Sequence, residues 1–157
     1  MATSLKAIRA ALFDVLTSEE ELAAWALEHF GAEALHGFTG RQIGTIADAE
    51  KPAIFVGSGG VVDADEPAIG GASTDKHVEI PFWFLWNEED AEDAADQHDE
   101  LNDILSRVVL RNAALGDANE VVLVTAEPTR TELPTQIHEC AIRAQFTLSA
   151  AAVSAAA

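Results

Sequence analysis

The sequence predicts an α/β (α+β) fold: a single domain with a mostly antiparallel or mixed four-stranded sheet and helices packed on one face. Three observations lead to this prediction. The 157 residues suit one domain, and apolar residues make up 48% of them, which is enough for a packed core. Segments with helical and strand-like spacing of apolar residues follow one another in the order α, α, β, β, α, β, β. We place the domain at residues 3–149 and expect a flexible alanine-rich tail at 150–157.

Two amphipathic helices are expected first, at residues 3–16 and 18–30. In both segments apolar side chains recur every three or four residues. Ser18 and Glu21 have the spacing of a capping box, which predicts that the second helix begins after Ser18. The third and longest helix is expected at 88–114, where apolar residues again recur at helical spacing.

Four strands are expected, at residues 53–56, 76–87, 120–127 and 136–148. The second carries large apolar side chains on both faces. This indicates that both faces are covered, one by the core and the other by a helix or by another subunit. Pro81 has no N–H to donate to a neighbouring strand, so we expect an edge position or a bulge there.

Two glycine-containing segments interrupt these elements. Residues 31–51 predict a turn followed by an extended stretch. Residues 57–75 predict a long loop that can include a short hairpin, and loops of this length in a small domain are usually either functional or disordered.

The charge of the chain excludes several kinds of partner. Its formal net charge is -18, from 27 acids and 9 bases, and such a surface repels both nucleic-acid phosphates and anionic membranes. The strongly apolar run 80–86 is far shorter than the roughly 20 residues of a membrane-spanning helix. We therefore expect a soluble protein made in the cytoplasm. Cys140 is the only cysteine, which excludes an internal disulfide and a cysteine-based zinc site.

Motifs for catalysis or cofactor binding are weak. The glycines at 57–60 follow a strand, but acids rather than a helix come next, so we interpret them as a turn. The acids at 63–66 resemble only half of a calcium loop. The nine acids from Glu88 to Asp103 are interpreted as a solvated helix face, and His138 and Cys140 as core residues of one strand face. We expect no enzyme activity, no cofactor and no metal site.

Several short segments of the sequence occur in an order known from one protein family. They are the opening helix at 4–12, residues 38–41 ahead of the strand at 51–56, the apolar strand at 78–86, the acidic helix start at 88–91 and the closing strand at 144–148. In these features residues 3–149 resemble the tail-terminator proteins (tail-completion, minor tail protein U-like) of long-tailed bacteriophages.

The resemblance implies a homo-hexameric ring that caps the tail tube, ends tube polymerisation and joins the tail to the head connector. It implies as partners the chain itself, the tail tube protein and a head-completion or connector protein. DNA would pass through the ring without being bound. The protein would be assembled in the host cytoplasm and reside in the virion. No catalytic residue is implied, because the family has none.

Two sets of residues are expected to serve such a ring. Contacts with another subunit or partner are expected at apolar side chains of the long loop and the two-faced strand: Val61, Val62, Trp83, Leu85 and Trp86. An acidic lumen that repels DNA is expected from two acidic runs: Asp63, Asp65, Glu66, Glu88, Glu89, Asp90, Glu92 and Asp93.

Several alternatives remain open. One is an acidic dimer of the secretion-chaperone kind, which would hold an extended partner on its apolar strand faces. Another is a metal-dependent hydrolase that uses the acids of 88–103. A third is a different head–tail connector or completion protein of the virion. The acidity, with only three lysines against 27 acids, also suits a halophilic host, where surface acids serve solubility.

Overall fold

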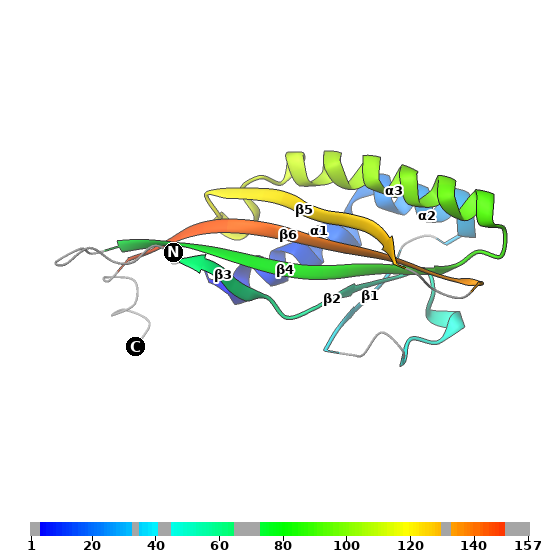
Figure 1. The fold of residues 1–157 in the computed structure, drawn as a ribbon, viewed down its shortest axis with the longest axis horizontal. Coiled ribbons are helices and arrows are strands. Elements are labelled where there is room, and N and C mark those ends of the chain that lie inside the picture. Colours follow the sequence, from blue (N-terminus) through cyan, green and yellow to red (C-terminus); the bar gives the residue numbers. More distant parts are fainter. Residues whose placement is uncertain (1–3, 33–34, 41–44, 65–72, 130–132, 150–157) are drawn as a thin grey trace.

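The computed structural model describes residues 4–32, 35–40, 45–64, 73–129 and 133–149, and the expected tail at 150–157 lies outside them. Within this part of the chain the predicted α+β fold is confirmed, with helices packed on one face of a mixed sheet (Figure 1). The helices are α1 (Leu5–Ser18), α2 (Glu20–Phe30) and α3 (Ala91–Arg111), with short 3₁₀ turns η2 (Asp48–Glu50) and η3 (Leu115–Asp117). The strands are β1 (His36–Thr39), β2 (Ala53–Val56), β3 (Gly60–Ala64), β4 (Ser73–Asn87), β5 (Glu120–Thr129) and β6 (Thr135–Ser149).

The sheet has six strands among the described residues, two more than expected. Their order is β1-β2-β4-β6-β5, and β3 pairs with β4 on the same side as β2. β1 and β2 are parallel, whereas every other described pair is antiparallel. β4 and β6 pair along all fifteen residues of each strand, and their outer ends project with β3 beyond the helices (Figure 1). β5 lies at one edge of the sheet, and β1 and β3 lie at the other.

The core lies between the sheet and the three helices. Alternate side chains of β4 face it, as strand geometry requires, and all are at most 1% exposed: Val78, Ile80, Phe82, Phe84 and Trp86. Full burial of each such side chain stabilises the fold by about 1.5–3 kcal/mol. The predicted core face of this strand is therefore confirmed.

The boundary between α1 and α2 differs from the expected one. Ser18 does not cap α2; it is the last residue of α1, and its hydroxyl donates to the carbonyl of Asp14. Only Glu19, with φ -68° and ψ 126°, leaves the helical conformation before α2 begins at Glu20. The capping-box spacing was misleading because a hydroxyl can instead bond to the carbonyl four residues earlier in its own helix.

The long helix begins three residues later than expected. Asp90 is its N-cap, with its side chain accepting from the Asp93 N–H, and the helix runs from Ala91 to Arg111. Acids in the first turn are favoured by the helix dipole.

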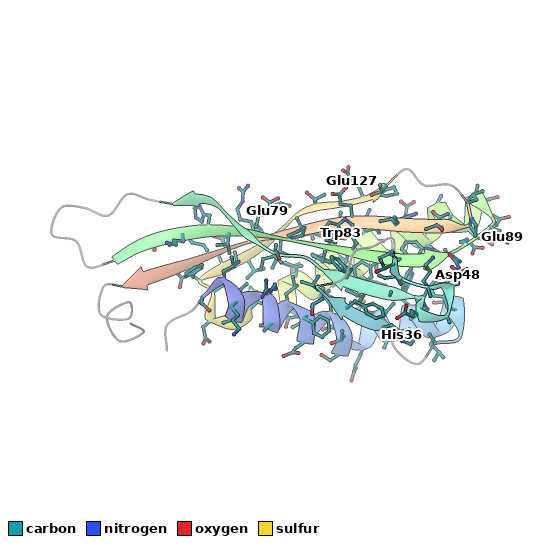
Figure 2. The ribbon with its side chains drawn as sticks, turned by 90° about the horizontal axis from the view of Figure 1, so that it is seen from below. His36, Asp48, Glu79, Trp83, Glu89 and Glu127 are labelled. Carbon is teal, nitrogen blue, oxygen red and sulfur yellow. The ribbon has the colours of Figure 1, made fainter. Side chains whose placement is uncertain are left out.

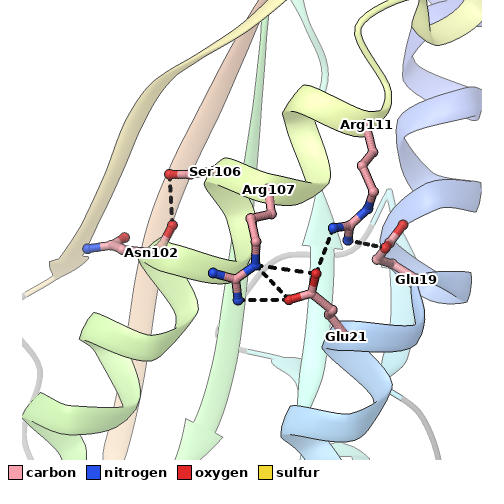
Figure 3. Close-up of polar contacts among 6 residues, drawn as sticks. All are labelled: Glu19, Glu21, Asn102, Ser106, Arg107 and Arg111. Carbon is pink, nitrogen blue, oxygen red and sulfur yellow. Dashed lines mark hydrogen bonds and ion pairs between the residues drawn. The ribbon is translucent and has the colours of Figure 1, made fainter.

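Ion pairs hold α3 against α2 (Figure 3). The Arg107 guanidinium donates to both carboxylate oxygens of Glu21, at 2.8–3.3 Å. Arg111 donates to Glu21 at 2.6 Å and also to Glu19. Hydrogen bonds from Arg107 and then from Arg111 lower the pKa of Glu21. Because these groups are exposed, solvent screens their attraction, and the pairs orient the two helices more than they stabilise them.

Gly37 explains why an unexpected strand forms at 36–39. A Cβ atom at this position would lie 2.6 Å from Thr17 Cγ2 and 2.8 Å from Phe13 Cζ, both on α1. Only glycine lets α1 pack this closely on β1. The glycine therefore marks a close approach between elements, whereas its conformational freedom alone predicts a turn.

Pro81 lies neither at an edge nor at a bulge, which corrects the prediction. β4 is a central strand, and Pro81 is in regular register with Ala141 of β6. Its carbonyl accepts from Gly57 N–H at 2.9 Å, so its nitrogen points to the same side, where β2 has ended and β3 has not begun. The missing N–H thus falls in the gap between two strands, where no ladder bond is lost.

No helix among the described residues combines the length and the apolar composition that a membrane crossing requires.

Candidate functional site

An apolar cluster lies on the sheet face that points away from the helices. Its members come from β1, β2, β4 and β6 and from the connection before β2. They are the buried Ile46, Ala53, Phe55 and Leu85 and the half-buried Phe38, Trp83 and Ile137. Trp83 is half-buried here, and its ring centroid lies 5.4 Å from that of Phe55. Figure 2 shows the molecule from this side, with Trp83 near the middle of the sheet. Trp83 keeps surface that another molecule can reach, and its role as a contact residue stays a prediction.

Leu85 does not offer such a surface, contrary to expectation. It is 2% exposed and packs in the same apolar cluster as Ile46, which precedes η2. The parallel pairing of β1 with β2 requires the chain between them to return past the sheet, and Ile46 belongs to that connection. The second face of the two-faced strand is therefore covered at Leu85 by the chain itself rather than by another subunit.

Trp86 is also wrongly predicted as a contact residue. It is 1% exposed and lies in the core, with its ring centroid 5.2 Å from that of Trp25 in an edge-to-face arrangement. Its indole Nε1–H donates to Gln97 Oε1 at 2.8 Å. Alternation along β4 turns Trp86 toward the helices and Trp83 away from them, so only one of the two tryptophans reaches the surface.

The remaining predicted contact residues lie in β3. Val61 pairs with Val78, and the register shifts between Val61 and Asp63, which makes Val62 the extra residue of a bulge. The side chains of Val61, Val62 and Asp63 lie outside the described part, and so do residues 65–72, including Asp65 and Glu66.

The predicted acidic residues that are described gather where β4 passes into α3. Glu89, Asp90, Glu92 and Asp93 are exposed, and Figure 2 shows Glu89 at this end of the molecule. The negative charge of Asp90, with smaller contributions from burial and nearby acids, raises the pKa of Asp93. Glu88 differs from the others: it is half-buried, and its Oε1 accepts from Gln97 Nε2 at 2.7 Å. Glu88 thus ties the segment just before α3 to Gln97 in the second turn of that helix.

The two predicted acidic runs do not form one patch in a single chain. Asp63 pairs with His77 near one end of β4, whereas Glu88 follows Asn87 at the other end. Ten residues of strand separate these positions, which corresponds to about 33 Å. The sequence predicted a lumen lined by acids of either run, and spacing along the chain does not show how far a long strand carries the two runs apart.

A buried polar cluster joins α3 to β6, and sequence reasoning missed it. The Nδ1 atoms of His98 and His138 lie 2.8 Å apart, and the two rings stack with centroids 5.0 Å apart. His98 Nε2 lies 3.1 Å from Gln136 Oε1, and His138 Nε2 lies 2.6 Å from Asn102 Oδ1. The available signal was that His98 lies on the same helical stripe as the buried Leu101.

Hydrogen bonding fixes the protons of this pair. Gln136 Nε2 donates to the Glu88 carbonyl at 3.3 Å, so Gln136 Oε1 accepts from His98 Nε2–H. Asn102 Oδ1 likewise accepts from His138 Nε2–H at 2.6 Å, so two neutral rings both present an unprotonated Nδ1 at their 2.8 Å contact. Burial, and then the charge of His98, lower the pKa of His138 to about 4, while burial lowers that of His98. Both rings are therefore neutral at pH 7, and their burial fits a structural role.

Cys140 follows on the same strand face. It is fully buried, and burial raises the pKa of its thiol well above the ordinary value. Its interpretation as a small apolar core residue agrees with this environment. No three His, Cys, Asp or Glu side chains among the described residues come together as a metal site would require.

A pocket of about 480 Å³ opens between α1 and the carboxyl ends of the parallel strands β1 and β2. Helix α1 contributes Lys6, Arg9, Ala10, Phe13 and Asp14, and the strand ends contribute Thr39, Gly40, Phe55, Val56, Gly57 and Ser58. Carboxyl ends of parallel strands are a frequent place for ligands. Sequence reasoning missed this pocket because β1 was not expected, and without β1 the two bases of α1 have no site to face.

A scan against protein-family models finds no model that matches the chain, and a search of curated proteins finds no match either.

Proposed function

We propose that the chain is a structural, non-catalytic virion protein that forms a ring, the tail terminator of a long-tailed bacteriophage. The observation that supports this most is that one sheet ends in two unlike edges. Among the described strands β5 pairs only with β6, and at the other edge the sheet ends in β1 and β3. Two unlike patches on one subunit allow head-to-tail contacts, and such contacts close into rings when the rotation between subunits permits.

The β5 edge has features of a contact surface. It is ten residues long, and the N–H and C=O groups that alternate residues turn outward face no described strand. Val122 and Val124 are 39% and 40% exposed on it, beside a register shift between Leu123 and Thr125. An edge strand of this length is open to pairing with another chain unless something covers it. A neighbouring subunit is the cover that a ring would supply.

The charge of the molecule suits a ring that conducts DNA. A lumen lined with acids repels phosphate, so DNA would pass without being held. Within the proposal, acids from the two runs of the chain, at 63–66 and at 88–93, line this lumen from opposite ends of β4. The partners would be the tail tube protein on one side and a head-completion or connector protein on the other.

The test is the assembly state of the purified chain, measured by size-exclusion chromatography with light scattering and by negative-stain microscopy. The proposal expects a ring, a hexamer by the family resemblance, with a central hole wide enough for DNA, formed either alone or on tail tubes. A stable dimer without a ring would instead support the chaperone alternative. A tightly bound metal found by elemental analysis would support the hydrolase alternative.

Binding to purified tail tubes separates the terminator from its nearest relatives in the virion. A tail terminator should cosediment with tubes and stop their growth. A ring that binds only the head connector would support the alternative of a different completion protein.

A further inference from the structure

We propose that the pocket beside Lys6 and Arg9 receives the paired carboxylates of Glu127 and Glu139 from a second copy of this chain. This inference rests on the proposed ring and names the contact that would join its subunits. It depends on three observations: cations without acidic partners, acids placed directly opposite each other, and the position of the two patches on opposite sides of the sheet.

Lys6 and Arg9 stand out among the bases of the chain. Seven basic residues are described, and four of them form ion pairs with acids of the same chain: Lys51, Arg107, Arg111 and Arg143. The other three, Lys6, Arg9 and Lys76, form none with the described residues, although acids outnumber bases by 27 to 9 in the sequence, and of these three only Lys6 and Arg9 lie side by side at one pocket. Both line the pocket, together with the hydroxyl-bearing Thr39 and Ser58 and one acid, Asp14. The pocket is therefore a locally cationic place on a strongly anionic molecule.

Glu127 and Glu139 form the complementary patch. They are register partners on β5 and β6, both are exposed, and both point away from the helices. Directly opposite side chains on neighbouring strands have Cβ atoms about 4.5–5.5 Å apart, and like charges in this position destabilise a sheet. Neither forms an ion pair with a described residue. A cation from another molecule would relieve their repulsion.

The Lys6 and Arg9 pocket and the Glu127 and Glu139 patch are too far apart to meet within one chain. They are well placed to meet between two copies of the chain. Four strand spacings separate β1 from β5, which corresponds to about 19 Å. Both patches lie at a similar level along β4, because Glu139 pairs with Trp83 while Gly57 of the pocket bonds to Pro81. Figure 2 shows Glu127 at the side of the sheet opposite His36 of β1. Successive copies could therefore join side by side, each β5 edge against the next copy's pocket.

The pocket also has a chemistry that suits carboxylate side chains. Lysine and arginine donate charge-assisted hydrogen bonds to carboxylates, and hydroxyls can add neutral ones. Phe13 and Phe55 line the same pocket and can pack on the methylene groups of glutamate. A second copy is the favoured occupant because copies with a net charge of -18 repel one another, so an attractive contact is needed for them to assemble.

Two charge-reversed variants of the full chain test this contact. Lys6→Glu with Arg9→Glu makes the pocket acidic, and Glu127→Lys with Glu139→Lys makes the carboxylate patch basic. Each variant alone should lose assembly, weakening it roughly a hundredfold, because like charges then face each other at every contact. A 1:1 mixture should restore rings, because both kinds of contact become complementary again. Light scattering and native mass spectrometry should find equal numbers of the two variants, alternating around a ring of even number.

A matched control and a monomer measurement complete the test. Glu20→Lys with Glu28→Lys makes the same change of net charge as Glu127→Lys with Glu139→Lys, but at exposed positions of α2, and should leave assembly intact. Glu127→Gln should weaken assembly yet leave the monomer as stable as before or more stable, since it removes a like-charge pair. Unchanged assembly of both charge-reversed variants, or no recovery on mixing, overturns the inference while leaving a wild-type ring in place. A wild-type chain that forms no ring, alone or on tail tubes, overturns the proposed function itself.

Discussion

The two tryptophans near the end of β4 differ in role although only two residues separate them. Trp86 is enclosed by α2 and α3, whereas Trp83 is half-buried on the opposite face. Trp86→Ala should cost about 3–5 kcal/mol of unfolding free energy, because a large core side chain is lost and a cavity remains. Trp83→Ala should cost about half as much or less, because part of its ring is exposed.

Urea denaturation of both variants measures this difference. Trp86→Phe serves as a milder variant that removes the indole donor to Gln97 and part of the ring, and it should cost about 1–3 kcal/mol. Equal losses for the alanine variants at positions 83 and 86 would contradict the burial described above.

His138 makes the stability of the protein depend on pH. The unfolded chain takes up a proton on this residue near its ordinary pKa of 6.5, whereas burial lowers the pKa in the folded protein to about 4. Stability from the neutral ring is thus complete above pH 6.5 and is lost as the pH falls toward 4. The full effect is about 3 kcal/mol.

The measurement is the unfolding free energy of the wild type and of His138→Gln between pH 4 and pH 8. The variant should be less stable at pH 8 but should lose less stability on acidification. Parallel curves for the two proteins would show that another group is responsible for the acid sensitivity.

At the scale of elements, the packing of α1 on β1 depends on a missing side chain. Gly37→Ala places a methyl group within 2.6 Å of Thr17 Cγ2 and 2.8 Å of Phe13 Cζ. Forcing this overlap should cost about 1–3 kcal/mol, because α1 must shift or Phe13 must leave its rotamer. Gly60→Ala is the matched control, since no described atom lies within 4 Å of the added Cβ and the strand conformation suits alanine. Chemical denaturation of both should show a loss at position 37 only.

Elements with strong periodicity were predicted well. β2 was predicted with its observed bounds, 53–56, and α3, β4, β5 and β6 were found with ends displaced by a few residues. Their long apolar stripes leave one burial face, so periodicity determines them. β1 and β3 were predicted only as an extended stretch within 31–51 and as part of a loop at 57–75 that can include a hairpin, because each is short, contains glycine and becomes a strand only by pairing with β2 or β4. Such pairing depends on residues far away in the sequence.

The candidate sites were harder to predict than the elements. The alternation of side chains along β4 was enough to place Trp86 in the core. Trp86 was nevertheless predicted as a contact residue, on its hydrophobicity alone. The His98–His138 contact joins residues 40 positions apart. The pocket at Lys6 and Arg9 requires the unexpected β1, so no local pattern could reveal it.

At the scale of the whole molecule, the net charge of -18 opposes compactness. Acids in close proximity repel one another, as the raised pKa of Asp93 indicates. Salt screens such repulsion, since the Debye length falls from about 30 Å at 0.01 M to about 3 Å at 1 M. We expect the melting temperature to rise between 0.01 M and 1 M sodium chloride, with folding already complete at the lowest concentration.

Circular dichroism melting curves across this salt range measure the effect. A chain that folds only at molar salt would instead point to a halophilic origin of the acidity. A melting temperature that falls with salt would show that favourable ion pairs, such as those between α2 and α3, outweigh the repulsion.

The rate at which the single thiol of the chain is alkylated can measure how often the sheet opens. Cys140 sits at the centre of β6, where it is 0% exposed and its thiol is held protonated. Alkylating reagents react with exposed thiolates, so labelling requires β6 to separate from its neighbours or from the helices. Because no second cysteine exists, each labelled molecule reports one opening event at one known place. Pulsed alkylation followed by mass spectrometry can therefore time the loosening of the central strands without any engineered probe, in isolated subunits and in assembled ones alike.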